Sequence, residues 1–209
     1  MIFKIESPNA QGPGMPVSLC CPNCRRQGVF EGISATDLWE ANSRTMFGQR
    51  RCPNPECRTH IFFVLQNGKI VASYPAEKID FDTVNLPASV VAAFEEAITC
   101  HANQCYIAGA IMVRKTLEEL CRDRNAKGAN LKERIRALGS KVVLPQELLD
   151  GLDDLRLLGN DAAHIESQEY DQVGQEEVEV GIEFAKEVLK AVYQYSALLA
   201  RLRGLKKSP

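Results

Sequence analysis

The chain has 209 residues, of which 45% are hydrophobic and 25% charged, and its formal net charge is −2. This composition is ordinary for a folded chain of one medium domain or two small ones. The small net charge excludes a global electrostatic attraction to nucleic acid but leaves room for a local basic patch. No apolar run approaches the roughly 20 residues that a membrane span needs, and the opening residues lack the pattern of a signal peptide. We therefore expect a cytoplasmic protein whose thiols are kept reduced.

The cysteines gather near the start of the chain, where five of the eight precede residue 58. Cys21 and Cys24 have C-x2-C spacing in "CCPNC", and Cys52 and Cys57 have C-x4-C spacing in "CPNPEC". Under reducing conditions such paired turns favour a metal ion over disulfides. Four thiolates complete the tetrahedral shell that Zn²⁺ prefers and leave no position for substrate or water, so we expect a structural zinc site.

Two other ligands stay open at this stage. Cys20 is near enough to Cys24 to share a metal with it, and His60 could replace one of the four cysteines. The C-x2-C spacing is the commoner zinc turn. We therefore favour Cys21 over Cys20 and four cysteines over a histidine.

Strand signals follow the second cysteine turn. The runs "IFFVL" and "KIVASY" are rich in β-branched and aromatic residues, and Asn67-Gly68 between them indicates a two-residue hairpin turn. We expect residues 1–74 to form a zinc ribbon, with residues 25–51 as a loop between the cysteine turns.

That loop is rich in arginine and contains Trp39 and Phe47. These side chains could contact phosphate and stack on bases. The alternative is that the aromatic rings fill a small core and that some arginines offset the negative charge of the four thiolates. We favour the alternative.

After a linker at residues 75–86, the hydrophobic pattern changes to the 3.6-residue period of helices. Residues 87–209 are expected to form a bundle of five helices, which gives the chain an α+β fold overall. The helices should start at residues 87–88, 104, 130, 145 and 176, and the last should be long, reaching roughly residue 202 with Leu199 on its apolar face. Small residues near Gly159 would let a neighbouring helix approach the fourth helix closely.

The fourth helix carries Arg156, Asn160 and His164 along one edge of its apolar face, in "LRLLGNDAAH". His164 could act as a general base or acid in RNA cleavage, while Arg156 holds the phosphate and Asn160 orients the imidazole. Eight residues of helix separate the arginine from the histidine by about 12 Å. Two copies of the helix meeting across a two-fold axis would bring them together. The alternative, which we favour, is that these polar side chains only secure the end of the helix.

The helical part resembles domain-of-unknown-function family 4145. The matching residues are "LP" at 86–87, "EEA" at 95–97, "RKTLEEL" at 114–120, "NL" at 130–131 and "LRLLGNDAAH" at 155–164. The family is placed with the HEPN helical bundles of prokaryotic defence systems and toxins, and it also occurs joined to restriction-enzyme subunits. Many HEPN proteins are dimeric, metal-independent ribonucleases with an Arg-x4–6-His motif. The resemblance implies catalytic roles for Arg156 and His164, which seven residues separate here, with Asn160 beside them.

Three hypotheses of function follow. The first is a HEPN-like module, expected from the resemblance to form a homodimer, that binds RNA, DNA or a partner protein in a defence or restriction-related system. The second is a metal-independent endoribonuclease that uses Arg156 and His164 across a dimer groove. The third is a scaffold whose zinc ribbon docks a partner protein.

Overall fold

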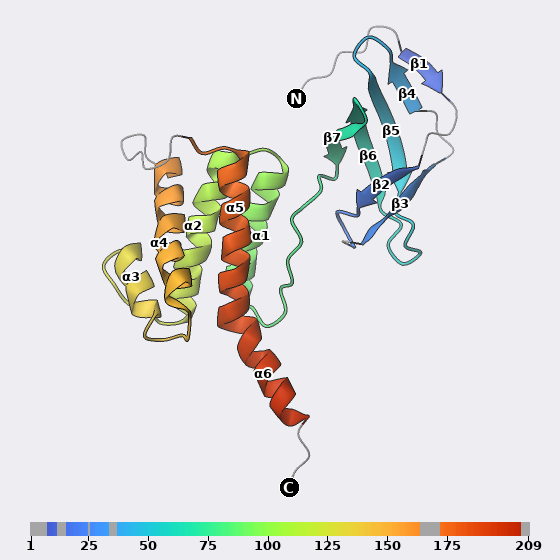
Figure 1. Ribbon diagram of the computed structural model, residues 1–209. Helices are drawn as coiled ribbons and strands as arrows, with labels where there is room; N and C mark the ends of the chain where they lie inside the picture. Colours follow the sequence, from blue (N-terminus) through green and yellow to red (C-terminus); the bar gives the residue numbers. More distant parts are fainter. Residues whose placement is uncertain (1–7, 12–15, 25, 34–36, 164–171, 206–209) are drawn as a thin grey trace. The chain divides into compact units, whose positions relative to one another are not determined.

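A computed structural model describes residues 8–11, 16–24, 26–33, 37–163 and 172–205. The chain divides into two compact units, Met1–Asp80 and Phe81–Pro209. The first unit, called the β unit below, is a β-sheet, and the second, the helical unit, is a bundle of helices (Figure 1). The predicted α+β class is therefore confirmed. The division falls within the segment that the sequence assigns to a linker.

The β unit contains a seven-stranded antiparallel sheet. Its strands are Pro8–Gln11 (β1), Val17–Cys20 (β2), Gln27–Gly32 (β3), Asp37–Glu40 (β4), Thr45–Arg51 (β5), His60–Gln66 (β6) and Lys69–Tyr74 (β7). β5 is the central strand, since it pairs with β3 and β4 on one side and with β6 along its whole length on the other. The predicted hairpin is confirmed: β6 and β7 meet at Asn67 and Gly68, whose φ angles of 49° and 78° suit a two-residue turn.

The prediction that residues 25–51 form a loop is wrong, because this segment supplies β3, β4 and β5. The strand pattern is hard to see in the sequence because polar residues occupy inward positions. Asp37 at the start of β4 and Arg50 near the end of β5 are both buried. A strand with charged residues on its core side does not show the alternation that marks a half-buried strand.

Arg50 and Asp37 are buried together as an ion pair. The two terminal nitrogens of Arg50 donate to the two carboxylate oxygens of Asp37 at 2.9 and 2.8 Å. The guanidinium also lies 4.7 Å from the ring centroid of Phe63. Neither interpretation of the loop arginines, contact with phosphate or compensation of the thiolates, therefore applies to Arg50, since Asp37 compensates its charge inside the unit.

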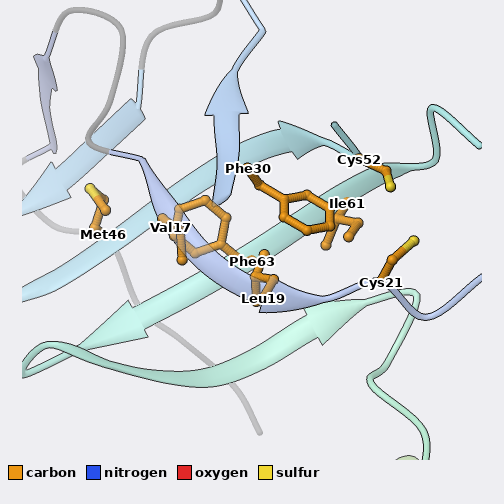
Figure 2. Close-up of a cluster of buried hydrophobic side chains, with 8 residues drawn as sticks. All are labelled: Val17, Leu19, Cys21, Phe30, Met46, Cys52, Ile61 and Phe63. Atoms are coloured by element: carbon orange, nitrogen blue, oxygen red, sulfur yellow. The ribbon is translucent and has the colours of Figure 1, made fainter. Parts of the chain in front are cut away.

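A small hydrophobic cluster forms the core of the β unit (Figure 2). Its buried members are Val17, Leu19, Cys21, Phe30, Met46, Cys52, Ile61 and Phe63. Trp39 packs against this cluster while remaining partly exposed, which agrees with a core role for that ring. Figure 2 shows Cys21 and Cys52 at one end of the cluster, so the cysteine turns close off the core.

The helical unit is a bundle in which the second helix packs against most of the others. Its helices are Ala88–Ala102 (α1), Tyr106–Asp123 (α2), Leu131–Leu138 (α3), Gln146–Ala163 (α4), Gln175–Leu189 (α5) and Tyr195–Gly204 (α6), with a π-helical turn, Lys190–Gln194 (η1), between the last two. α2 packs against α1, α3, α4 and α5. The predicted start of α3 is confirmed, because the Asn130 side chain accepts a hydrogen bond from the backbone N–H of Glu133. In the part of the chain that the structure describes, no helix is both long and apolar enough to cross a membrane.

α2 and α4 approach closely at Gly159, as the small residues predict. A Cβ atom at this buried position would lie 2.4 Å from the Cβ of Arg114 and 3.0 Å from the carbonyl oxygen of Ala110. Only a glycine allows the two backbones to come this close. The contact places the Arg156 edge of α4 beside α2.

The predicted long fifth helix is confirmed in its extent, because α5, η1 and α6 follow one another from Gln175 to Gly204. The π-helical turn η1 within it was not predicted, and α6 beyond this turn extends away from the bundle (Figure 1). Leu199, expected on the buried face, has half of its surface exposed. Tertiary contacts hold η1 in place: Tyr193 donates a hydrogen bond to Asp123 at 2.9 Å, and the Arg124 guanidinium covers the Tyr193 ring at 4.2 Å.

Candidate functional site

The four cysteines predicted as metal ligands come together in the β unit. The sulfur atoms of Cys21, Cys24, Cys52 and Cys57 all lie within 4.8 Å of one another. Cys21 and Cys57 are 3.7 Å apart, and Cys24 and Cys52 are 3.6 Å apart. In a tetrahedral shell with metal–sulfur bonds of about 2.3 Å, neighbouring sulfurs are about 3.8 Å apart. This donor set therefore fits a metal ion, and the site draws two ligands from each turn.

Backbone hydrogen bonds fix the two cysteine turns. The N–H of Cys21 donates to the carbonyl of Arg26 at 3.1 Å, and the N–H of Cys52 donates to the carbonyl of Thr59 at 2.8 Å. In the second turn the Asn54 side chain accepts from the N–H of Glu56 at 3.2 Å, as expected for asparagine in a turn. Each turn is therefore closed by hydrogen bonds of its own.

The thiols of the second turn have opposite electrostatic environments. The Thr59 hydroxyl, 3.0 Å from the sulfur of Cys57, lowers the pKa of that thiol to about 6, because a donor hydroxyl stabilises the thiolate. Burial raises the pKa of Cys52 to about 12. A bound cation would favour the thiolate form of both residues, because metal ligands must be deprotonated.

The two alternative ligands lie outside this cluster. Among the described residues, the one group of cysteine, histidine and acidic side chains close enough to share a metal is the set of four cysteines. Cys20 ends β2 and pairs with Gln27 of β3. His60 is exposed and stacks on Phe62, with 4.7 Å between ring centroids.

The outer face of the sheet carries exposed aromatic side chains that the sequence interpretation did not single out. Phe62 on β6 is 50% exposed and Tyr74 on β7 is 74% exposed, and the two residues are cross-strand partners. A hollow of about 420 Å³ lies on this face, lined by Leu38, Phe47, Gly48, Gln49, Phe62, Phe63, Val64, Ala72, Ser73 and Tyr74. The sequence does hold a signal for it. Three apolar residues in succession, Ile61 to Phe63, cannot all point inward on a strand.

An arginine borders this aromatic face. Arg51 is exposed and pairs with His60 across β5 and β6, so both side chains lie on the same face as Phe62. Arg51 also pairs with exposed Glu31 on β3. Arg58, which directly follows the second cysteine turn, is also exposed, and it lines a hollow together with Arg51 and Glu31. The local charge is therefore mixed with a basic excess.

The predicted catalytic residues are only partly described. Arg156 and Asn160 lie one turn apart on α4 and are both half-buried, whereas His164 falls outside the described residues. The Nε of Arg156 donates to Asp153 at 2.6 Å. This hydrogen bond lowers the pKa of the Asp153 carboxyl. The arginine carbonyl accepts a hydrogen bond from Arg114 at 3.4 Å, so the Arg156 segment is tied both within α4 and to α2.

Comparison with protein families gives one match. The profile of DUF4145, described as a domain of unknown function, covers residues 95–206, more than half of the chain. The chain belongs to this family. The DUF4145 match runs from within α1 to the end of α6 and includes Arg156 and Asn160, whereas the cysteine cluster lies outside it. A search of curated proteins and a search of solved structures both gave no match.

Proposed function

We propose that this DUF4145 protein is a binding module in which a structural zinc ion supports a sheet that binds single-stranded nucleic acid. The observation that carries the proposal is the exposed pair Phe62 and Tyr74 on the outer face of that sheet. The resemblance to HEPN bundles supports a prokaryotic defence or restriction-related context. The identity of the ion and the identity of the ligand are argued in turn.

The proposed ion is zinc because the donor set consists of four sulfurs. Thiolates are soft ligands, and four of them in a closed tetrahedral arrangement suit Zn²⁺. With all four positions filled by Cys21, Cys24, Cys52 and Cys57, no position is open for water or substrate, so the ion would stabilise the fold and perform no chemistry. Elemental analysis should find about one zinc per chain.

The proposed ligand is single-stranded nucleic acid because the aromatic face suits stacking. Bases stack on exposed aromatic rings without strong sequence preference, and each stacked base contributes roughly 1–3 kcal/mol. Phe62 and Tyr74 offer two rings on adjacent strands, and His60 stacks on the first of them. Arg51 on the same face could neutralise a backbone phosphate. A duplex buries its base faces, so it should bind more weakly.

Fluorescence anisotropy with labelled single-stranded RNA and DNA, at several salt concentrations, tests this proposal. The double variant Phe62→Ala/Tyr74→Ala should bind at least tenfold more weakly than the unmodified chain, while Val143→Ser, at a fully exposed apolar residue of the helical unit, should bind normally. Equal binding by the Phe62/Tyr74 variant, or a preference for duplex, would overturn the proposal. A partner protein on the same face would then be the better interpretation.

The endoribonuclease using Arg156 and His164 across a dimer groove is kept as the alternative function. It is supported by the position of Arg156 and Asn160 one turn apart within the DUF4145 match. Asp153 holds the guanidinium, so a substrate phosphate would have to compete with that carboxylate. RNA cleavage in the presence of EDTA that disappears in His164→Ala would favour the enzyme. No cleavage by either protein, across varied RNAs, would favour the binding module.

A further inference from the structure

The C-terminal helix α6 carries an apolar stripe that is exposed in the described part of the chain. The stripe consists of large residues that are about half exposed or more, at helical spacing: Tyr195, Leu198, Leu199, Leu202 and Leu205. Within the described residues, the main packing contacts of α6 are with the η1 turn that precedes it. Arg201 and Arg203 are exposed beside the stripe, and Tyr195–Leu205 contains no acidic residue. α6 is therefore an amphipathic and basic helix whose apolar stripe no other described helix covers.

α5 has a groove of the opposite charge. A hollow of about 930 Å³ runs along this helix, with Val180 and Phe184 as its apolar residues and four glutamates around them, namely Glu176, Glu179, Glu183 and Glu187. Val180 is 62% exposed, and the ring of Phe184 packs over Gly151 of α4. The groove is thus an apolar strip inside an acidic rim.

The charges around this groove remain negative after its own pairs are counted. Lys186 pairs with Glu183 at 3.0 Å and Lys190 pairs with Glu187 at 2.7 Å, both within the helix. His101 lies 3.8 Å from Glu179. On α4, the exposed acidic residue Glu147 stands one turn before Gly151 along the helix. Four glutamates with one further acidic neighbour therefore outnumber two lysines.

We infer that α6 of one copy docks in the α5 groove of a second copy, in a reciprocal two-fold dimer. Ten residues make α6 about 15 Å long, and the groove from Glu176 to Glu187 is roughly 17 Å long. The leucines would cover Val180 and Phe184, and the two arginines would meet the acidic rim. Lengths, polarity and charge therefore match.

The occupant must come from another copy because α6 cannot reach the groove of its own chain. α5, η1 and α6 form one continuous helical path, so α6 leads away from α5 (Figure 1). When two such paths lie antiparallel with the two-fold axis beside η1, residues 176–187 of each copy face residues 195–205 of the other. Counted at about 100° per residue, with one residue subtracted for the π turn, the stripe and the groove are less than a quarter of a turn apart around the path. Both contacts can then form at once, as a closed two-fold interface requires.

Charge reversal and mixing test this dimer by sedimentation velocity on the full chain at several concentrations. The unmodified chain should dimerise. Arg201→Glu/Arg203→Glu makes both contacts acidic against acidic, and Glu179→Arg/Glu183→Arg makes both basic against basic, so each variant should dissociate at least tenfold more readily. An equimolar mixture should dimerise again, because both contacts of the mixed dimer are complementary. Val143→Ser, a fully exposed apolar residue outside the stripe, should behave normally.

Several outcomes would overturn the inference. A monomeric unmodified chain would exclude a second copy as the occupant. A dimer that persists in the Glu179/Glu183 variant would indicate pairing of α6 with α6 or a contact through α4. Failure of the mixture to recover dimers, with far-UV circular dichroism showing both variants folded, would exclude the reciprocal arrangement. None of these outcomes bears on nucleic-acid binding by the sheet, so the two proposals can fail separately.

Discussion

The β unit and the helical unit differ in what fills their interiors. The fully buried polar residues of the β unit are Asp37, Glu40, Thr45 and Arg50, whereas the described part of the helical unit buries only Thr116 and Glu119. A small unit encloses little apolar surface. The β unit supplements its hydrophobic cluster with a buried ion pair and with a group of four cysteines, two of which, Cys21 and Cys52, also belong to that cluster. The helical unit depends on ordinary apolar packing. The comparison teaches that specific polar groups stabilise the first unit and shape complementarity stabilises the second.

Loss of the proposed zinc ion should have the largest effect, and it should unfold the β unit while the helical unit stays folded. Cys52→Ser removes one ligand, and structural zinc sites contribute about 10–16 kcal/mol of apparent binding free energy, more than most domains have in stability. We expect the amide NMR signals of β2–β7 to collapse to unfolded positions while those of α1–α5 persist. Chelation of the unmodified chain should give the same result.

Cys20→Ser is the matched control for that experiment. Cys20 is adjacent to Cys21 in sequence but lies outside the sulfur cluster, so its replacement should leave zinc content and β-unit signals unchanged. A folded β unit in metal-free Cys52→Ser would contradict the comparison, because the hydrophobic cluster alone would then be sufficient.

The buried ion pair should have the next largest effect. Asp37→Asn leaves the Arg50 guanidinium buried without its counter-charge and should cost about 3–5 kcal/mol. The double variant Asp37→Leu/Arg50→Met removes both charges and should recover most of that loss. Trp39 is the single tryptophan of the chain and lies in β4, so denaturant unfolding followed by its fluorescence reports on the β unit.

Arg51→Met provides the control for the ion pair. Arg51 follows Arg50 in the sequence but is exposed, and its replacement should change the free energy of unfolding by no more than about 0.5 kcal/mol. If Asp37→Asn were equally mild, the pair would contribute little and the β unit would depend on its apolar cluster after all.

The smallest of the three effects concerns the helical unit. Gly159→Ala places a Cβ atom against Arg114 and Ala110, and overpacking costs about 1–3 kcal/mol. Alanine is the better helix former by roughly 1 kcal/mol, so we expect a net loss of about 1 kcal/mol in chemical unfolding followed at 222 nm. Gly204→Ala, where nothing lies within 4 Å of the added atom, should be neutral or slightly stabilising. Stabilisation by both substitutions would mean that close packing at Gly159 is unimportant.

Features with local signals could be predicted from the sequence. The Asn67-Gly68 turn needs two residues with positive φ, and Asn130 with Glu133 specifies a helix start, so each is determined by a few neighbouring residues. The cysteine spacing likewise anticipated which four sulfurs would gather. The turn and the helix start each depend on residues close together in sequence, and the sulfur cluster follows from a known metal-binding spacing.

Features that depend on distant contacts could not be predicted. The strands between the cysteine turns were missed because Arg50 becomes a core residue only when Asp37 is beside it. The π turn η1 was not predicted because it depends on Asp123 and Arg124, some 70 residues away in sequence, which hold Tyr193 in the widened turn. For the same reason, Leu199 fits a buried helical stripe in the sequence yet is exposed.

The π-helical turn η1 also gives the chain tolerance of its exact length at this point. A π turn has one more residue than the α-helical turn it replaces, and Val192 and Tyr193 anchor it in the core. Since the extra residue is accommodated within the turn, deletion of one residue there would restore α-helical geometry and leave the leucines of α6 on nearly the same side of the helix. Insertion of one residue directly after the turn, in α-helical geometry, would instead rotate everything beyond it by about 100° around the axis.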